Sequence, residues 1–358
     1  MKAIQKITTT VLFISFLTLC CEAIELHPKL KVNGYSSFEY EYMFDDKGKG
    51  DPNGSFDADL FDLVFNIFPT DRLRVAADLT WEHGSASEDG RGNVALEYAF
   101  GEYTVKDSVR VRAGKMFSNF GIYNEIHTAK PAFLTVKEPQ STNKNHKFGS
   151  GDGIRFYPRW TTGLAVLNDG MHGNNEYDWV LQLTNGEQSV TNPYEEDNNS
   201  LKALGGRFRY GFENGIKLGA SFYHDSLEDT TTGYDKQLSY GLQLEYNPTA
   251  LGFELEYVKG TVDNPSGTNP KLDRWAYTAM FFYTFKNKYT PYLRYEYLDP
   301  DKTIDNDTAN LSIVGVNIKL DSSITWKVEL DFFSSDKGNA RFSGNDYTEF
   351  KSAFAIGF

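Results

Sequence analysis

Three features are nearly absent from this sequence of 358 residues: cysteine, long apolar runs and runs of basic residues. The two cysteines, Cys20 and Cys21, are adjacent near the start, so no disulfide framework holds the rest of the chain. Beyond residue 23 no stretch of 18 apolar residues occurs, which excludes an ordinary helical membrane protein. A formal charge of −13 without a basic run argues against a nucleic-acid partner.

The abundant residues favour β-strands. Aromatic residues make up 15% of the chain, with 22 Tyr and 27 Phe against only 5 Met. Aromatic side chains suit half-buried strands better than helices. The mean hydropathy of −0.48 is that of a water-soluble chain.

The first residues have the pattern of a secretory signal peptide. Lys2 and Lys6 precede an apolar stretch that ends at Cys21 and is too short to span a bilayer as a helix. We place cleavage after Ala23, so that residues 1–23 are removed and the mature chain has no cysteine. Lipid attachment at Cys20 is the alternative, but the preceding leucine is larger than such sites usually carry.

Alternation with a period of two organises the remaining sequence. Between Ile324 and Phe333 apolar and polar residues alternate, and the same pattern recurs near Leu73, Leu238 and Tyr289. Such a strand has one apolar wall and one wet wall. A soluble sandwich would alternate too, but its wet face would look outward.

Sixteen strands can be counted in this way, and short turns alternate with long polar loops between them. The strands start near Leu30, Phe56, Leu73, Val94, Val109, Gly163, Tyr177, Leu204, Ile216, Leu238, Gly252, Trp275, Tyr289, Leu311, Ile324 and Tyr347. Sorting of loops by length is typical of outer-membrane barrels. We predict an all-β fold, a transmembrane antiparallel β-barrel over residues 24–358, with 16 strands and with 14 or 18 as alternatives. Its surroundings would be the lipid bilayer and lipopolysaccharide of a bacterial outer membrane.

The last strand supports this prediction. Phe350, Phe354, Ile356 and Phe358 share one face, and the chain as given ends on an aromatic residue. This pattern resembles the C-terminal signal of bacterial outer-membrane proteins, which implies recognition by the barrel-assembly machinery. An ordinary amphipathic edge strand is the alternative interpretation.

A barrel of this width is not filled by its own side chains, so an aqueous lumen is expected. The connection from Ser118 to Trp160 is 43 residues long and is the third long loop. Loops of this length are uncommon unless they are functional. We therefore predict that residues 118–160 fold inward as a constriction.

The segment from Ala113 to Glu125 adds a family resemblance. Its sequence, AGKMFSNFGIYNE, is similar to the strand end and inward loop of the phosphate-selective porin family. The resemblance implies a 16-stranded, trimeric, passive channel without a cofactor. It does not carry phosphate selectivity, because no run of lumen arginines and lysines matches that of the family's phosphate channels.

Charged residues of the long loop and of the inward faces are the candidate pore residues. In and beside the loop these are Lys115, Glu125, Lys130, Lys137, Lys144, Lys147, Arg155 and Arg159. On the lumen wall they are Arg74, Arg110, Arg112, Arg207, Arg209, Lys217, Glu245, Glu254, Glu256, Arg294, Glu296, Glu329 and Asp331. One hypothesis is a basic wall facing an acidic wall, with a transverse field that favours polar solutes. The alternative is that these charges pair and merely keep the pore wet, with the loop lysines on a solvated face.

Two other functions are weighed against a channel. A barrel hydrolase would need a triad, and His224 with Asp225 and Ser226 on one strand does not converge as a triad requires. A barrel for adhesion or ligand binding would use its outer loops, whose composition is also what solubility alone produces. Aspartates between Asp299 and Asp307 could hold Ca²⁺, but a solvated acidic loop is the favoured interpretation. We expect no enzyme activity and no metal site.

Overall fold

A computed structural model describes residues 24–44, 53–82, 94–142, 156–185, 201–229, 233–248, 250–263, 271–336 and 346–358. The predicted signal peptide lies outside these residues. Almost all regular structure in them is β-strand. The first nine strands are β1 (Ile24–His27), β2 (Leu30–Met43), β3 (Ser55–Thr70), β4 (Leu73–Glu82), β5 (Val94–Lys106), β6 (Val109–Phe117), β7 (Trp160–His172), β8 (Asn175–Thr184) and β9 (Ala203–Gly211). The others are β10 (Ile216–Asp229), β11 (Gly233–Tyr246), β12 (Leu251–Asp263), β13 (Lys271–Tyr283), β14 (Tyr289–Asp299), β15 (Ala309–Lys319), β16 (Ile324–Ser335) and β17 (Tyr347–Gly357).

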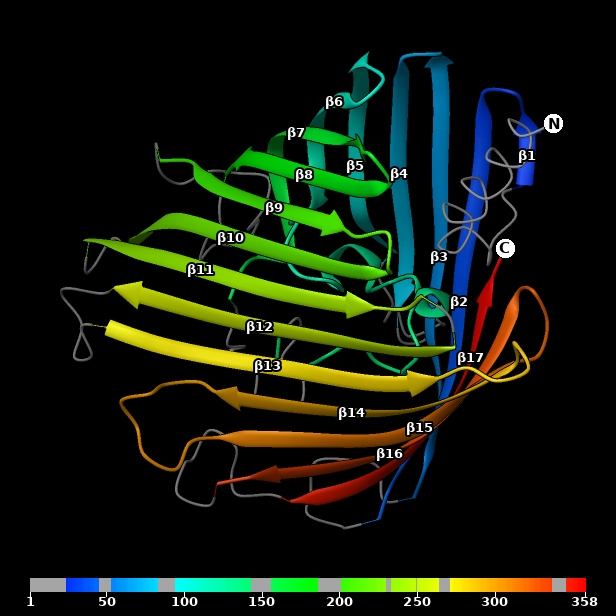
Figure 1. The fold of residues 1–358 in the computed structure, drawn as a ribbon, viewed down its shortest axis with the longest axis vertical. Coiled ribbons are helices and arrows are strands. Elements are labelled where there is room, and N and C mark those ends of the chain that lie inside the picture. The colour runs from blue at the N-terminus through cyan, green and yellow to red at the C-terminus, as the bar shows by residue number, and fades with distance from the viewer. Residues whose placement is uncertain are drawn as a thin grey trace.

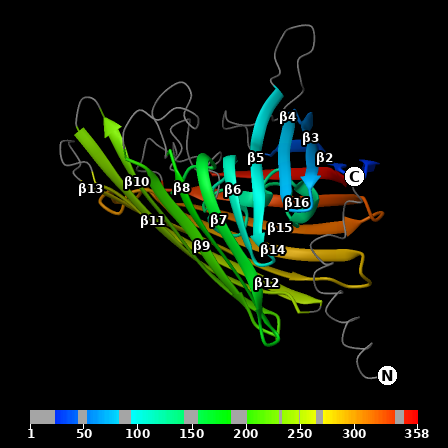
Figure 2. The same ribbon diagram turned by 90° about the horizontal axis from the view of Figure 1, so that it is seen from above.

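The strands β2 to β17 form a closed antiparallel barrel. Each strand pairs with its neighbour in sequence, and β17 pairs back onto β2 from Gly357 opposite Tyr35 to Glu349 opposite Met43. The prediction of 16 strands is confirmed. Figure 1 shows β2 to β5 running steeply across the direction of β11 to β16, as the twist of a closed sheet requires. Figure 2 shows the same wall from above.

The short strand β1 was not predicted. Ile24 and Glu25 pair with Val32 and Lys31 of β2, on the stretch of β2 that lies beyond the end of β17. The two ends of the described chain therefore cover one edge of β2 in succession. An uncovered edge would leave backbone groups unpaired.

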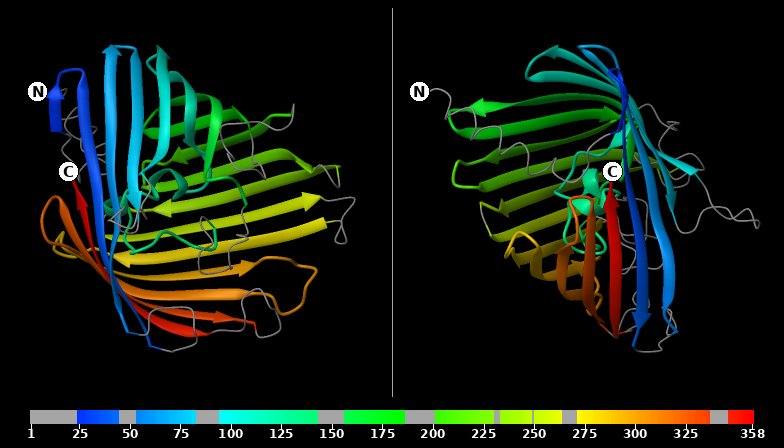
Figure 3. Two further views of the ribbon diagram at one scale, coloured as in Figure 1. Left: turned by 180° about the vertical axis from the view of Figure 1, so that it is seen from behind. Right: turned by 90° about the vertical axis from the view of Figure 1, so that its right-hand side faces the viewer.

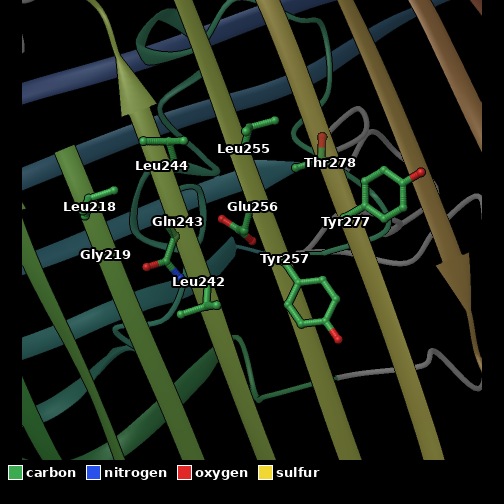
Figure 4. Close-up of a pocket in the computed structure, with 10 residues that line it drawn as sticks. All are labelled: Leu218, Gly219, Leu242, Gln243, Leu244, Leu255, Glu256, Tyr257, Tyr277 and Thr278. Carbon is green, nitrogen blue, oxygen red and sulfur yellow. The ribbon is translucent and has the colours of Figure 1, made fainter. Parts of the chain in front are cut away.

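Side chains alternate between the two faces of the wall. Figure 4 shows a hollow between β10 and β13, lined by the large apolar side chains of Leu218, Leu242 and Tyr257. Leu218 and Leu242 are exposed on the outer face, whereas Gln243 and Glu256 are buried on the other side of the sheet. The hollow is thus a groove on the lipid-facing side, and the polar residues face the lumen.

The described helical structure is confined to two short 3₁₀ turns between β6 and β7. They are η1 (Asn124–Ile126) and η2 (Lys130–Ala132). No helix among the residues that the structure describes is long and apolar enough to cross a membrane. The segment that holds these turns is the predicted inward loop.

The closing seam brings the last residue against Gly34. The Gly34 amide donates to the Phe358 carbonyl at 2.7 Å, and the Phe358 amide donates to the Gly34 carbonyl at 3.0 Å. A Cβ atom at Gly34 would overlap the Phe358 ring and approach the Asp62 carbonyl to 2.7 Å. The absence of a side chain at Gly34 is what lets the terminal ring pack on the seam.

We expect Gly34→Val to lower the free energy of unfolding by roughly 1–3 kcal/mol, because the added methyl groups displace the Phe358 ring from the seam. Urea unfolding of protein refolded in detergent micelles measures this without the cellular assembly machinery. Gly101→Val is the matched control, since a Cβ there meets no atom within 4 Å. An equal loss in both variants would contradict the role of the seam contact.

Candidate pore constriction

The segment that follows β6 is clamped at its base. The Ser118 amide donates to the Arg159 carbonyl at 3.0 Å, which closes the loop where β6 ends and β7 begins. The Asn124 side-chain amide donates to the Ser118 carbonyl at 2.8 Å and to the Arg159 carbonyl at 3.0 Å. Figure 3 shows this segment, in teal, enclosed by the strands of the wall.

The first anchor lies on β10 and β12. The Gly121 amide donates to Ser221 Oγ at 3.1 Å, and the Ile122 amide donates to Glu256 Oε2 at 2.7 Å. The Tyr123 hydroxyl donates to the carboxylate of Glu254. Gly121 has a φ of +69°, and a Cβ there would lie 2.9 Å from the Glu256 carboxylate oxygens. The chain thus turns close against this carboxylate.

The second anchor lies on β14 and β16, where two wall carboxylates accept hydrogen bonds from the loop backbone. The Val136 amide donates to Glu329 Oε2 at 3.0 Å. The Gln140 and Ser141 amides donate to Glu296 Oε2 at 2.7 and 2.8 Å. Hydrogen bonds to an ionised acceptor are stronger than neutral ones.

Arg294 strengthens the same anchor from β14. It is fully buried and forms an ion pair with Glu296 at 2.9 Å. Its guanidinium donates to Thr135 Oγ1 at 2.5 Å and to the Lys137 carbonyl at 2.9 Å. The charges of Arg294 and Glu296 are therefore used to hold the loop and do not face a water-filled passage.

Lys327 of β16 also binds the loop through its backbone. Its ammonium donates to the carbonyls of Lys130, Phe133 and Thr135 at 2.5, 2.7 and 2.9 Å. The sequence pattern placed Lys327 on the polar face of its strand but did not identify it as a pore residue. Its partners lie almost 200 residues away in sequence, so no local signal could reveal them.

Two loop lysines are neutralised by carboxylates of β2 and β3. Lys130 Nζ lies 3.1 Å from Asp59 and 4.0 Å from Glu39. Lys137 Nζ lies 2.6 Å from Asp59 and also contacts Glu39. Burial alone would lower the pKa of both lysines, but the attraction of Asp59 for Lys130 and of Glu39 for Lys137 raises each pKa above the ordinary range. Neither Glu39 nor Asp59 was among the predicted pore residues.

Two further predicted loop residues are paired. Arg159 binds Glu138 of the same loop at 3.0 Å. Glu125 forms an ion pair with Arg207 of β9 at 2.5 Å and accepts a hydrogen bond from the side-chain amide of Asn119. The loop is therefore held by its charges, and the solvated loop face that served as the alternative is absent at Lys130 and Arg159, which are both buried.

The basic residues of β4, β6, β9 and β10 lie toward the short-turn end of the wall. Each of them has an acidic neighbour, but several remain partly exposed. The pairs are Arg74 and Arg112 with Glu102 at 3.5 and 2.7 Å, Arg110 with Asp169, Arg209 with Asp178 at 3.0 Å, and Lys217 with Glu176 at 3.0 Å. These basic residues, called the basic wall below, are thus paired but remain partly exposed. The acidic residues of β12, β14 and β16 are instead covered by the loop.

Lys115 does not join these residues. It pairs in register with Ala99 and Thr162 on the outer side of β6, opposite to Arg112, and its ammonium donates to the Leu96 carbonyl at 2.6 Å. Alternation along β6 accounts for this placement, because Lys115 is an odd number of residues from Arg112. We therefore leave Lys115 out of the constriction. Lys144, Lys147 and Arg155 lie outside the described residues.

The residues weighed for catalysis do not come together. His224 lies on the outer face of β10, where its Nδ1 is 3.0 Å from the Gln237 carbonyl. Asp225 faces the lumen and accepts a hydrogen bond from the Tyr223 hydroxyl at 2.8 Å. Neighbouring residues on opposite faces of a strand cannot form a triad. Within the described ranges, no three His, Cys, Asp or Glu side chains are arranged to hold a metal ion.

His127 is a buried residue of the loop and lies beside β5. Its Nδ1 lies 2.6 Å from the Asn124 carbonyl, and its Nε2 lies 3.6 Å from the Glu97 carboxylate. Trp160 also donates to this carboxylate, at 2.7 Å. Burial, together with the positive charge of Arg159, lowers the pKa of His127 to about 4. The packed loop therefore holds His127 in its neutral form.

Comparison with known proteins places this geometry among porins. Residues 156–358 match the family model described as "Putative beta-barrel porin-2, OmpL-like". An uncharacterized protein of Aquifex aeolicus (strain VF5) is 24% identical over 212 residues, which cover 56% of this chain and 45% of that protein. The match thus spans about half the length of this curated relative.

Solved structures of outer-membrane proteins share the fold. The anion-selective porin from Comamonas acidovorans superposes with a TM-score of 0.66 at 12% identity, covering 92% of this chain and 99% of that one. The trimer form of OmpT, an outer-membrane protein of Vibrio cholerae, superposes with a TM-score of 0.59 at 13% identity, covering 92% and 99%. At these identities the likeness concerns the fold alone.

We expect acidification from about pH 6.5 to about pH 4 to favour release of the loop. A released His127 binds a proton near its ordinary pKa of about 6.5, whereas the packed residue does so only near pH 4, so the packed form loses stability across this window. The measurement is ion conductance through the purified protein between pH 7 and pH 4, which should rise as the pH falls. His127→Gln cannot take up this proton, so its conductance should change less with pH. Identical conductance–pH profiles for wild type and His127→Gln would contradict the role given to His127.

Proposed function

The chain belongs to the OmpL-like family of outer-membrane β-barrel porins, and we propose that it forms a passive, water-filled channel for ions and small hydrophilic solutes. One observation carries the proposal. The barrel has a polar inner face, and a long segment is anchored across that face by charged residues of β2, β3, β12, β14 and β16. A barrel of 16 strands is wide enough to leave an aqueous passage beside this segment.

The proposed constriction is the segment 118–160 itself. Its described part, residues 118–142, draws its partners from distant strands and so crosses the lumen rather than lying against one strand. The proposed passage runs beside β4, β6 and β10, where Arg74, Arg110 and Lys217 remain partly exposed. A solute would pass between the loop and the partly exposed basic wall.

The exposed charges support a modest preference for anions. Arg74 and Arg110 each leave 36% of the side chain exposed, whereas the side chains of Glu296 and Asp331 are at most 1% exposed. Charges that face the water act on a passing ion more than charges that are buried and paired. Asp169 and Glu176, the partners of Arg110 and Lys217, leave 48% and 52% of their side chains exposed and moderate the preference.

The assembly and partners belong to the same proposal. The OmpT structure in its trimer form supports a homotrimer for this chain. The apolar outer wall supports contact with lipid and lipopolysaccharide, and the terminal strand with Phe358 supports recognition by the barrel-assembly machinery.

Purified, refolded protein in a planar bilayer should show stepwise conductance. Replacing residues 119–147 by a short glycine-serine linker should raise the single-channel conductance, because the segment no longer narrows the passage. Heat-modifiable migration on gels confirms that both proteins fold. Folded wild-type protein without conductance steps would contradict the channel, and an unchanged conductance in the folded deletion variant would contradict the constriction.

The zero-current potential in a KCl gradient should indicate a chloride preference. The triple variant Arg74→Gln, Arg110→Gln, Arg112→Gln should shift this potential toward potassium, because it removes three cations from the open side of the passage. Lys115→Gln removes the same type of charge from the outer face and is the matched control. A shift of the zero-current potential of similar size in the control would contradict the assignment of selectivity to the basic wall.

A further inference from the structure

We propose that Lys327 is the positioning residue that fixes the far end of the constriction, and that removal of its side chain leaves a site for a small primary ammonium ion. The inference rests on the proposed role of segment 118–160 as the constriction. It concerns a residue on β16, far in sequence from the loop that it holds. The proposed ammonium site is formed by carbonyl groups of the loop backbone, which come together only when the loop is folded.

The three acceptors of Lys327 converge on one point. They are the carbonyl oxygens of Lys130, Phe133 and Thr135, at 2.5, 2.7 and 2.9 Å from Nζ. Since an ammonium group has three N–H donors, these bonds use all of them. The Phe133 ring lies 4.6 Å from Nζ and adds a cation–π contact on a further side.

This environment differs from that of the other buried wall lysine. Lys327 is 1% exposed, and its ammonium contacts backbone carbonyls and an aromatic ring. Lys351 of β17 is equally buried, but its ammonium is bound by the carboxylates of Asp331 and Glu349. Lys351 therefore stabilises the wall, whereas Lys327 joins the wall to the loop.

The three carbonyls are themselves stabilised by the hydrogen bonds from the Lys327 ammonium. The η2 turn (Lys130–Ala132) is too short to satisfy its own carbonyls by helical hydrogen bonds, and it packs against β2 and β17. Buried carbonyls without a donor are unfavourable. Without Lys327 this part of the loop would gain by moving into water, which would widen the passage.

The vacancy left by Lys327→Ala has a defined chemistry. Alanine keeps Cβ, so the missing atoms are three carbons and the ammonium, which n-propylammonium supplies. This ion can donate to the three carbonyls and contact the Phe133 ring. The neutral molecule n-propanol has a similar shape but carries a single donor and no charge.

Single-channel recording provides the test. Lys327→Ala should conduct roughly twofold more than wild type, and n-propylammonium should return its conductance toward that of wild type. Lys327→Met fills the space without the charge, so it should conduct more than wild type and show no response to the amine. Lys351→Ala should neither conduct more than wild type nor respond to the amine, because the carboxylates of Asp331 and Glu349 on the wall bind the Lys351 ammonium.

Three outcomes would overturn the inference. One is a folded Lys327→Ala variant that conducts like wild type. Another is an amine effect of the same size in wild type and Lys327→Met, which would indicate block of the pore. The third is restoration by n-propanol as effective as that by n-propylammonium.

Proteolysis separates this inference from the proposed channel function. Chymotrypsin can cut after Phe133 only when this buried residue leaves its place beside Lys327, which binds its carbonyl. In detergent, Lys327→Ala should be cleaved there faster than wild type, and n-propylammonium should slow the cleavage. Failure of wild-type protein to conduct would refute the channel, while equal cleavage rates in both proteins would refute the role of Lys327.

Discussion

Buried charge that must find a partner determines how this barrel and its inner loop are built. The wall carboxylates Glu256, Glu296 and Glu329 are almost fully buried, and each accepts at least one hydrogen bond from a loop amide. An unpaired buried carboxylate is strongly unfavourable, and so is an unpaired buried amide. Loop and wall therefore stabilise each other, because each supplies the partner that the other lacks.

This mutual pairing also divides the lumen. The loop covers the acidic residues of β12, β14 and β16 together with Arg207 of β9, and it leaves basic residues of β4, β6 and β10 partly exposed. The same set of lumen charges would act differently on an ion if the loop covered the basic residues instead of the acidic ones. Selectivity in such a barrel is a property of which charges are covered, and the net charge of −13 does not determine it.

Much of the fold could be predicted from local patterns, and much of the site could not. Alternation with a period of two located all sixteen barrel strands, because the pleat places neighbouring residues on opposite faces. The great length of the third loop marked it for a role in the lumen. The same alternation, applied to Lys115, would have placed it outside.

The partners of the loop were beyond such patterns. Glu39 and Asp59 bind Lys130 and Lys137 from strands distant in sequence, and Lys327 binds carbonyls almost 200 residues away. A backbone carbonyl carries no sequence signal, and the distance between two strands around a barrel depends on closure of the whole sheet. β1 was missed because four residues are too few for a periodic pattern.

The pairing of both chain ends with β2 has a kinetic consequence. The seam joins Tyr35 to Gly357, so the contact that closes the barrel spans nearly the entire sequence. Contacts of this separation form late, because the entropy of closing the chain must be overcome before the last ladder forms. Until then β2 and β17 both expose unpaired edges. Closure of the barrel therefore awaits the final strand, and until it occurs the unpaired edges are unfavourable in lipid.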